Sequence, residues 1–285
     1  MAESAGAVVA AAPRPRNYYT EPQRLDVSGV RVAYRRKGAG EPTLFFHGAG
    51  FTRMWLPFLE ALSGGVELIA PEHPGYGETE MPDWLDGFED LVIHYDEFLD
   101  TLELETVHLV GYSLGGWIAA EFAAFYPKRL RSLTLITPAG LRILGKPIVN
   151  PIAMSPDQFL DLIFNDKTNI GDVQPDFESL DEIVHQFGEA ATLARLAWNP
   201  QYDLKLERRL ARVGCPSLVV RAEHDRLIPD EMAERYAELL PNSRVETIPG
   251  TGHAIAYEQP ERTAAAIVAF IRDVAGSVEA DRSAR

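Results

Sequence analysis

The sequence predicts an α/β fold: a mostly parallel, roughly eight-stranded twisted sheet flanked by helices, with a helical lid inserted after the sixth strand. Two observations predict it. From Arg24 onward, short β-rich runs alternate with stretches of helical periodicity, the pattern of a parallel sheet covered by helices. Between Thr137 and about Leu210 this alternation gives way to helical fragments rich in Phe and Leu, with several Pro and Gly residues and no clear strand.

The individual elements follow from periodicity and turn residues. Strands are expected at residues 30–36, 43–46, 66–70, 106–110, 133–136, 217–221 and 244–248. Helices are expected at residues 54–62, 88–102, 115–126, 230–240 and 260–274. The second of these helices has one apolar face, whereas the third is apolar nearly all round and is therefore expected to be buried.

The chain is predicted to form one domain with an insertion. A total of 285 residues, 46% of them hydrophobic, suffices for one large core, placed at residues 24–137 and 211–275. The lid is placed at 138–210, and residues 1–23 and 276–285 are expected to be flexible. The apolar stretch at 5–12 is too short to cross a bilayer and lacks a basic leader, so no membrane span is expected.

Composition argues against several classes of partner. The formal net charge of −15 disfavours nucleic acid, whose phosphates are bound by Lys and Arg. Cys215 is the only cysteine, so no internal disulfide or cysteine metal cluster can form, and a cytoplasmic location is expected. The histidines lack ligand-like spacing, so neither a metal nor a cofactor is expected. A homodimer stays open, because the sequence does not decide the oligomeric state.

One segment imitates a phosphate-binding loop. Residues 140–146 read Gly-Leu-Arg-Ile-Leu-Gly-Lys after a predicted strand. Pro147 stands where a Ser or Thr would hold magnesium, and Asn150 with Pro151 prevents the long helix whose amino end would cradle phosphate. We therefore predict no nucleotide site.

The sharpest local signal for chemistry surrounds Ser113. Gly111, Tyr112, Ser113, Leu114 and Gly115 fit G-x-S-x-G between a predicted strand and a predicted helix. A serine there sits on a tight, strained turn that exposes its hydroxyl, and the flanking glycines let strand and helix backbones approach. We therefore interpret Ser113 as a catalytic nucleophile rather than an ordinary turn serine.

A serine nucleophile needs a base, and the base needs a group that orients it. Asp225 and His253 follow two later predicted strands, so both fall at the sheet edge that carries Ser113. The order Ser, Asp, His along the chain favours a triad over a capping aspartate and a solvated histidine. Glu223 is the competing acid. Asp225 is preferred because it lies further out in the loop.

These features together resemble the α/β-hydrolase superfamily over nearly the whole chain, from about Arg24 to Val274. His47, Gly48, Ala49 and Gly50 resemble its His-Gly-x oxyanion segment. The resemblance implies that the backbone N–H groups of Ala49 and Leu114 hold the oxyanion, with His47 supporting the turn. Residues 72–79 resemble a second turn of the family, which usually has Asp at its first position and Ser at its last. Here the turn begins with Glu72 and ends with Thr79.

The predicted function is hydrolysis of a small carboxylic ester or lactone, without a cofactor, through an acyl-enzyme on Ser113. One alternative is C–C bond hydrolysis of a vinylogous diketone, which in the family usually accompanies a longer glycine-rich oxyanion segment, whereas Phe51 follows Gly50 here. Another is a non-catalytic ligand receptor. Tyr112 is predicted to contact the substrate. Five lid residues are predicted either to line the substrate pocket or equally to pack the lid itself: Met154, Phe159, Phe164, Phe187 and Trp198.

Overall fold

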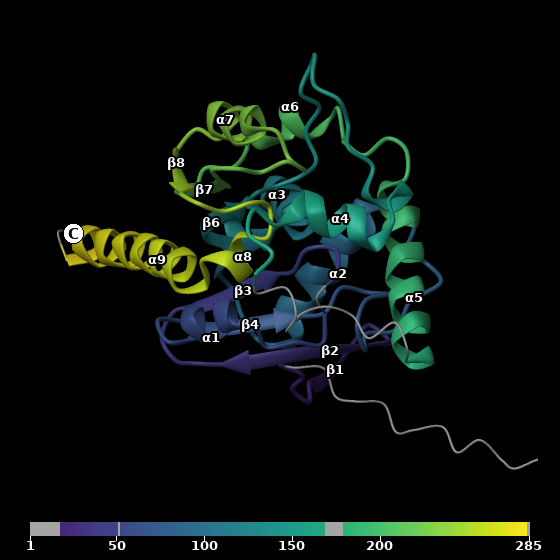
Figure 1. Ribbon diagram of the computed structural model, residues 1–285. Coiled ribbons are helices and arrows are strands. Elements are labelled where there is room, and N and C mark those ends of the chain that lie inside the picture. Colours follow the sequence, from purple (N-terminus) through teal and green to yellow (C-terminus); the bar gives the residue numbers. More distant parts are fainter. Residues whose placement is uncertain (1–17, 51, 169–178, 284–285) are drawn as a thin grey trace, which may run out of the picture.

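The computed structural model describes residues 18–50, 52–168 and 179–283 (Figure 1). Its centre is one eight-stranded sheet in the order β1-β2-β4-β3-β5-β6-β7-β8. β1 pairs antiparallel with β2, and β2 pairs antiparallel with β4. All the other pairs are parallel. The strands are β1 Gln23–Val27, β2 Val30–Lys37, β3 Pro42–Phe46, β4 Glu67–Pro71, β5 Val107–Tyr112, β6 Leu130–Ile136, β7 Ser217–Ala222 and β8 Ser243–Ile248. The predicted α/β class and the mostly parallel sheet are confirmed.

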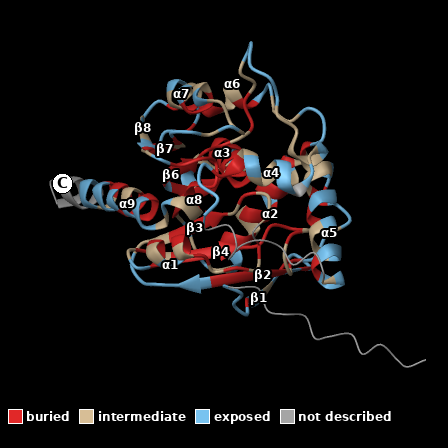
Figure 2. Cartoon of the chain, in the orientation of Figure 1, coloured by how far each residue is buried: buried red, intermediate tan, exposed pale blue. Residues whose placement is uncertain are grey.

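Helices cover both faces of the sheet. The described helices are α1 Pro57–Ser63, α2 Phe88–Thr101, α3 Leu114–Phe125, α4 Pro156–Ile163, α5 Leu180–Ala197, α6 Leu206–Leu210, α7 Asp230–Leu239, α8 Ile255–Glu258 and α9 Pro260–Ser283. Two short 3-10 turns lie at Pro127–Arg129 and Pro151–Ala153. One apolar core joins the sheet to α2, α3, α6 and α7, and a second joins its other face to α1, α8 and α9. Buried residues accordingly fill the centre of Figure 2.

α3 is buried on nearly every side, as its composition predicts. Its residues from Leu114 to Ala124 are all buried, because the helix runs between the sheet, α2 and α6. The long connection between β6 and β7 holds α4, α5 and α6, and none of its described residues (137–168 and 179–216) extends the sheet. We call this connection the insertion.

Two helix boundaries differ clearly from the sequence-based expectation. The first helix begins at Pro57 rather than residue 54, because proline suits the first helical turn and disfavours helix in the residue before it. The last helix continues past Val274 to Ser283. Gly276 lies within this helix and destabilises it by only about 1 kcal/mol, and the Ala, Glu and Arg residues that follow in the sequence favour helix.

The amino-terminal segment is anchored earlier than expected. Flexibility was predicted for residues 1–23, of which 1–17 lie outside the described residues. From Tyr18 on, the chain is tied to the core: Tyr18 O accepts the Trp55 N–H at 2.8 Å. The Arg35 guanidinium donates to the Thr20 carbonyl and hydroxyl oxygens. Residues 18–22 therefore lead directly into β1.

A buried ion pair joins the end of the insertion to α3. Glu121 is 1% exposed, and its Oε2 atom accepts a hydrogen bond from Arg209 Nη1 at 2.5 Å, while Oε1 has no partner among the described residues. Burial raises the pKa of Glu121 to about 7, and Arg209 offsets only part of that rise. An acid that gains protons on folding stabilises the fold least when the pH is high.

This pair predicts a pH dependence of stability. Because the folded-state pKa is raised from 4.5 to about 7, the Glu121 contribution is fully present below pH 4.5 and is lost as the pH rises through 7. We expect Glu121→Gln to flatten the stability profile between these values by up to ~3 kcal/mol. Urea unfolding from pH 4.5 to 8 measures this, with the exposed Glu103→Gln as control. Parallel profiles for Glu121→Gln and the unmodified chain would contradict the assignment.

Candidate active site

Ser113 sits at a strained turn where β5 ends and α3 begins. Its backbone has φ 55° and ψ −111°, a conformation that residues other than glycine rarely adopt and that costs roughly 1–3 kcal/mol. The Ser113 N–H donates to Ile136 O at 2.9 Å, and its carbonyl oxygen accepts the Trp117 N–H at 3.1 Å. Bonds to β6 and to the first turn of α3 thus hold the strained residue in place.

The glycines on either side of Ser113 are required by close backbone contacts. A Cβ atom on Gly111 would lie 2.3 Å from the carbonyl oxygen of Gly115. A Cβ atom on Gly115 would lie 2.2 Å from the carbonyl oxygen of Phe46, at the end of β3. No side chain fits at either distance, so the structure shows the packing reason for the G-x-S-x-G pattern.

His253 connects Ser113 to Asp225. Its Nε2 atom lies 2.9 Å from Ser113 Oγ, and its Nδ1 atom lies 2.8 Å from Asp225 Oδ2. A carboxylate only accepts hydrogen bonds, so Nδ1 carries the proton and Nε2 is free to accept one from the serine hydroxyl. The His253 and Asp225 side chains are 5% and 4% exposed. The structure brings together all three residues selected from the sequence.

Asp225, not Glu223, faces the histidine. Its second carboxylate oxygen accepts the N–H groups of Leu227 and Ile228 at 2.9 and 2.8 Å, which fixes the carboxylate in its loop. Glu223 is 48% exposed at its side chain and accepts the Gly250 N–H at 2.8 Å. The competing acid therefore braces the histidine loop from outside.

Two further side chains position the histidine loop. The Tyr112 hydroxyl donates to His253 O at 2.7 Å, and the two rings stack with centroids 5.8 Å apart. Glu258 accepts the Gly252 N–H at 2.6 Å through one oxygen and the Asp166 N–H at 2.6 Å through the other. The sequence analysis missed Glu258, because an acid on the helix after the loop carries no motif.

Two unbonded backbone donors lie beside the serine. Ala49 and Leu114 both line the pocket that contains Ser113. Among the described residues, neither N–H group donates a hydrogen bond, and that of Leu114 belongs to the first turn of α3, where no helical acceptor exists. Gly48 brings this segment close, since a Cβ atom there would lie 3.3 Å from Ser113 Cβ.

His47 supports the segment as expected for a structural residue. Its Nε2 atom accepts the His73 N–H at 2.9 Å, and its Nδ1 atom lies 2.7 Å from Gly48 O. The His73 ring returns a bond from Nε2 to His47 O at 2.9 Å, and the ring centroids are 3.8 Å apart. Burial lowers the pKa of both histidines, so the pair is neutral and adds no charge behind the oxyanion segment.

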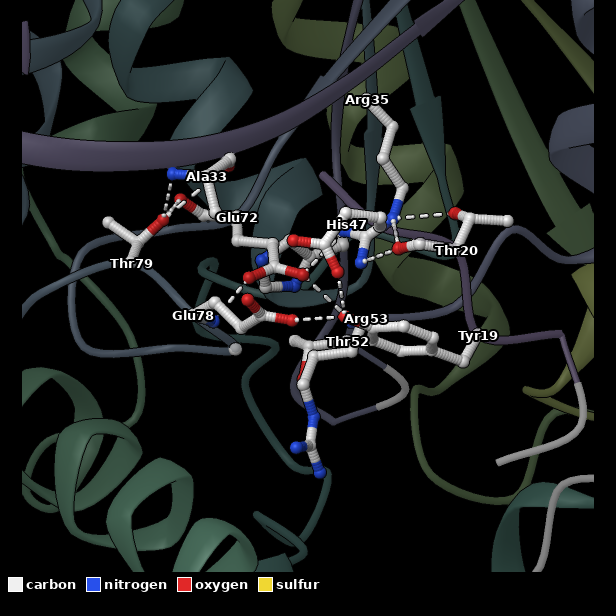
Figure 3. A network of polar contacts seen from close by, with 12 residues as sticks. Tyr19, Thr20, Ala33, Arg35, His47, Thr52, Arg53, Glu72, Glu78 and Thr79 are labelled. Carbon is white, nitrogen blue, oxygen red and sulfur yellow. Dashed lines mark hydrogen bonds and ion pairs between the residues drawn. The ribbon is translucent and has the colours of Figure 1, made fainter. Parts of the chain in front are cut away.

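Glu72 ties Arg53, three residues after the oxyanion segment, to the neighbouring turn (Figure 3). One carboxylate oxygen accepts Arg35 Nη1 at 2.6 Å and the Arg53 N–H at 3.0 Å, and the other accepts the Glu78 N–H. Thr79 closes the turn, since its hydroxyl donates to Glu72 O at 3.0 Å and accepts the Ala33 N–H at 2.9 Å. Glu and Thr thus fill the positions where the family turn usually has Asp and Ser.

A pocket opens above Ser113 and His253. It contains about 1130 Å³ of space not filled by atoms, its open mouth included, and extends beneath the insertion. Of the contacts predicted from the sequence, Tyr112 and Phe159 line it. The remaining lining is mostly aliphatic: Leu141, Ile143, Ile148, Val149, Ile152, Ile163, Leu193, Leu227, Ile228 and Met232.

The other aromatic and thioether side chains predicted as contacts lie elsewhere. Met154 does not line the pocket, because it follows the turn that carries Pro151 and Ile152 into it. Trp198 is 57% exposed at the end of α5 and Phe187 is 75% exposed, since both lie on the outer side of that helix. Phe164 is buried against Tyr257. Apolar spacing on a helix did not reveal which face meets the core.

The two cations at the pocket already have partners. Arg142 turns Nη1 to the carbonyl oxygens of Ile143 and Lys146, the latter at 2.9 Å. Lys146 forms an ion pair with Glu231 at 2.6 Å. Both cations lie among the lining residues, but their charged ends are held by the protein.

In the parts of the chain the structure describes, no three His, Cys, Asp or Glu side chains are grouped as metal ligands. No described helix is long and apolar enough to cross a bilayer.

A parallel sheet that carries a serine at a strained strand-to-helix turn, hydrogen-bonded to histidine and aspartate from later loops, defines a class of α/β proteins with a nucleophile elbow. The chain belongs to the alpha/beta hydrolase family, whose model matches residues 43–266. The resemblance proposed from the motifs is thereby confirmed.

Named relatives span more than one chemistry. The chain is 27% identical over 245 residues to 2-hydroxy-6-oxo-2,4-heptadienoate hydrolase of Pseudomonas putida, covering 81% of this chain and 89% of that protein. It is 24% identical over 265 residues to human monoacylglycerol lipase ABHD6, covering 84% and 77%. One further curated match, 36% identical over 120 residues, spans only 32% of that relative's length.

Among solved structures, the fold resembles a meta-cleavage product hydrolase from Pseudomonas fluorescens. The TM-score is 0.76 at 22% identity, with 89% of this chain and 98% of that chain covered. At this identity the likeness supports the fold alone.

The backbone contacts at Gly115 predict a stability effect. We expect Gly115→Ala to destabilise the fold by about 3 kcal/mol, because the added methyl group meets the backbone of β3, which cannot move aside. Gly188→Ala is the matched control: nothing lies within 4 Å of its added carbon inside α5, so it should stabilise by about 0.5–1 kcal/mol. Urea unfolding of both variants measures the difference. Equal stabilities would show that the contact does not constrain the elbow.

Proposed function

We propose that this chain is a serine hydrolase that cleaves small neutral carboxylic esters or lactones and needs no cofactor. The observation that carries the proposal is the continuous hydrogen-bonded chain from Ser113 through His253 to Asp225 at the floor of an apolar pocket. An intact chain of this kind argues against a non-catalytic receptor, which has no need of a base beside its serine.

The proposed reaction has two steps. Ser113 Oγ attacks the substrate carbonyl while its proton passes to His253 Nε2, and the tetrahedral intermediate collapses as the leaving alkoxide takes that proton. Water then attacks the acyl-enzyme, gives its proton to His253, and releases the acid and Ser113. Asp225 holds the imidazole in the required tautomer and stabilises its charged form.

The N–H groups of Ala49 and Leu114 would hold the oxyanion in both steps. They are the unbonded donors next to Ser113 described above, and backbone donors fixed before the reaction begins stabilise developing negative charge efficiently. The hydrogen bond from the His73 N–H to His47 supports such fixed positions, and Glu72 holds the chain three residues further on by accepting the Arg53 N–H.

The pocket supports a neutral acyl group. A substrate carboxylate would enter an aliphatic cavity whose neighbouring cations, Arg142 and Lys146, are engaged by backbone carbonyls and by Glu231. Leaving a charge unpaired in apolar surroundings is costly. This favours an ester over the heptadienoate that names one relative.

The insertion would act as a lid. Residues 138–210 contribute most of the aliphatic lining, so their identity would select the acyl group while the sheet edge supplies the chemistry.

C–C bond hydrolysis of a vinylogous diketone is the second candidate. It is favoured by the similarity to the hydrolase of 27% identity.

Substitutions in the triad test the mechanism. We expect Ser113→Ala and Asp225→Asn to lower kcat on p-nitrophenyl butyrate by about 10⁴-fold or more, because one removes the nucleophile and the other the group that fixes the histidine tautomer. Glu223→Gln, the competing acid, should retain activity within about tenfold. Labelling by a fluorophosphonate should also disappear with Ser113→Ala. Loss of activity in Glu223→Gln with Asp225→Asn still active would refute the assignment.

A matched pair of substrates tests the acyl preference. p-Nitrophenyl valerate and p-nitrophenyl hydrogen glutarate have acyl chains of equal length and differ in a terminal carboxylate. We expect kcat/KM to be at least ~100-fold higher for the neutral ester, equivalent to about 2.7 kcal/mol of unpaired charge. A preference for the acidic ester, or faster cleavage of a dienoate C–C substrate than of either ester, would favour the second candidate.

A further inference from the structure

The first half of α5 is amphipathic in the inverse sense to an ordinary surface helix. Helices on globular proteins turn apolar residues to the core and polar residues to water. In α5 the buried residues that face the protein include Glu182, Glu189 and Thr192. Leu193 and Leu196, in its second half, pack against the core, but the large apolar residues of its first half are exposed to solvent, along the outer edge of the molecule in Figure 2.

The inner face of α5 is held by polar contacts. Glu189 accepts hydrogen bonds from the Thr52 hydroxyl and from the Gly77 N–H, the latter at 3.1 Å, and lies 2.8 Å from His185 Nε2. Burial alone would raise the pKa of Glu189, but these partners, His185 first among them, lower it instead, so the buried carboxylate is ionised. The orientation of α5 is therefore specified by bonds that its outer face could not make.

The outer face is a continuous apolar stripe. Leu180, Ile183, Val184 and Phe187 recur at helical spacing and are 75%, 43%, 62% and 75% exposed. The stripe continues over the exposed Ala190 and Ala191 and the half-buried Ala194 to Trp198, which is 57% exposed. Large apolar residues gathered on one exposed helix face are typical of a binding surface.

We propose that this face binds the same face of a second copy of the chain, so that two α5 helices pack antiparallel in a homodimer. A twofold dimer brings one surface patch against itself, so the patch must be complementary to its own inverted copy. The sequence of α5 meets this condition in the size of its side chains and in its charges.

The size of the side chains changes along the stripe. Its first half carries the bulky residues, whereas its second half carries Ala190, Ala191 and Ala194. In antiparallel register about residue 189, Phe187 of one copy lies over Ala191 of the other, and Val184 lies over Ala194. Leu180 then meets Trp198 at each end. Phe187 and Val184 of each copy thus meet alanines of the other copy, which permits close packing in the middle of the contact.

The charges beside the stripe agree with this register. Asp181 and Arg195 are exposed on the same flank of α5, 14 residues apart. The twofold axis places residue 181 of one copy near residue 195 of the other, so two opposite-charge pairs form across the interface.

A lipid surface is the competing occupant, and the charge of the chain disfavours it. The net charge is −15, so an anionic bilayer would repel the chain; a second copy repels it as well, which weakens the dimer without excluding it. The stripe is about 27 Å long, from 18 residues at 1.5 Å each, and buries less than the roughly 800 Å² per partner of a stable interface. We therefore expect a dimer that forms reversibly with concentration.

Sedimentation equilibrium of the full chain tests the surface. The unmodified chain should pass from monomer to dimer as its concentration rises, and Phe187→Glu should weaken dimerisation at least ~100-fold by placing a charge at the centre of the contact. Leu204→Glu is the matched control, because Leu204 is 71% exposed in the insertion outside α5 and should leave dimerisation unchanged. Circular dichroism and the fluorophosphonate reaction check that each variant is folded.

A charge exchange tests the register. Asp181→Lys should weaken the dimer about tenfold by opposing Arg195 of the other copy, and adding Arg195→Glu should restore it. A chain that stays monomeric up to its solubility limit overturns the proposal. So does a dimer unaffected by Phe187→Glu, or one that the double variant fails to restore. If the monomer binds phosphatidylcholine vesicles and Phe187→Glu abolishes this, the stripe is a lipid-binding surface and the dimer is refuted.

Discussion

The close approach of α3 to the end of β3 is the constraint on which the site depends. At Gly115 the helix lies so near the Phe46 carbonyl that no side chain fits between them. This contact places the first N–H groups of α3 directly beside the oxyanion segment, which leaves β3 immediately after Phe46. It also forces the chain to turn sharply at Ser113, so the strain in that residue and the position of its hydroxyl have one cause.

The histidine arrives at this point through a second set of contacts, and they are polar. Tyr112, next to the serine in sequence, bonds to the carbonyl group of His253, so the elbow and the histidine loop are fixed to each other as well as through the triad. Glu223 and Glu258 accept the N–H groups of Gly250 and Gly252 in the same loop. Breaking these bonds costs free energy, most of all for the buried one from Tyr112, so together they favour the loop conformation that holds His253 at Ser113.

The elements predicted well from the sequence are those whose pattern has a local cause. The elbow, the acid and the histidine could be found because each follows a strand, and parallel strands end at one edge of the sheet. Helix α3 could be recognised as buried because it is apolar on all sides. In the insertion the same reasoning failed: the pattern predicts that Phe187 and Trp198 either line the substrate pocket or pack within the lid, yet both lie on the outer face. What orients α5 is the hydrogen bonding of Glu189 to Thr52 and Gly77, 137 and 112 residues distant in sequence, which no local periodicity reveals.

These contacts also constrain how the insertion can move. The end of α4 is bonded to the histidine loop, since Ile163 O accepts the Ala254 N–H at 2.8 Å. α5 is bonded through Glu189 to Thr52, close to the oxyanion segment. Motion of either helix would therefore disturb the groups that surround Ser113. The stretch before Pro151 has fewer such ties, and Leu144 at its tip is 87% exposed. Substrate entry is thus expected on the side of Leu144 and Ile148, where the wall of the pocket can open while the triad stays intact.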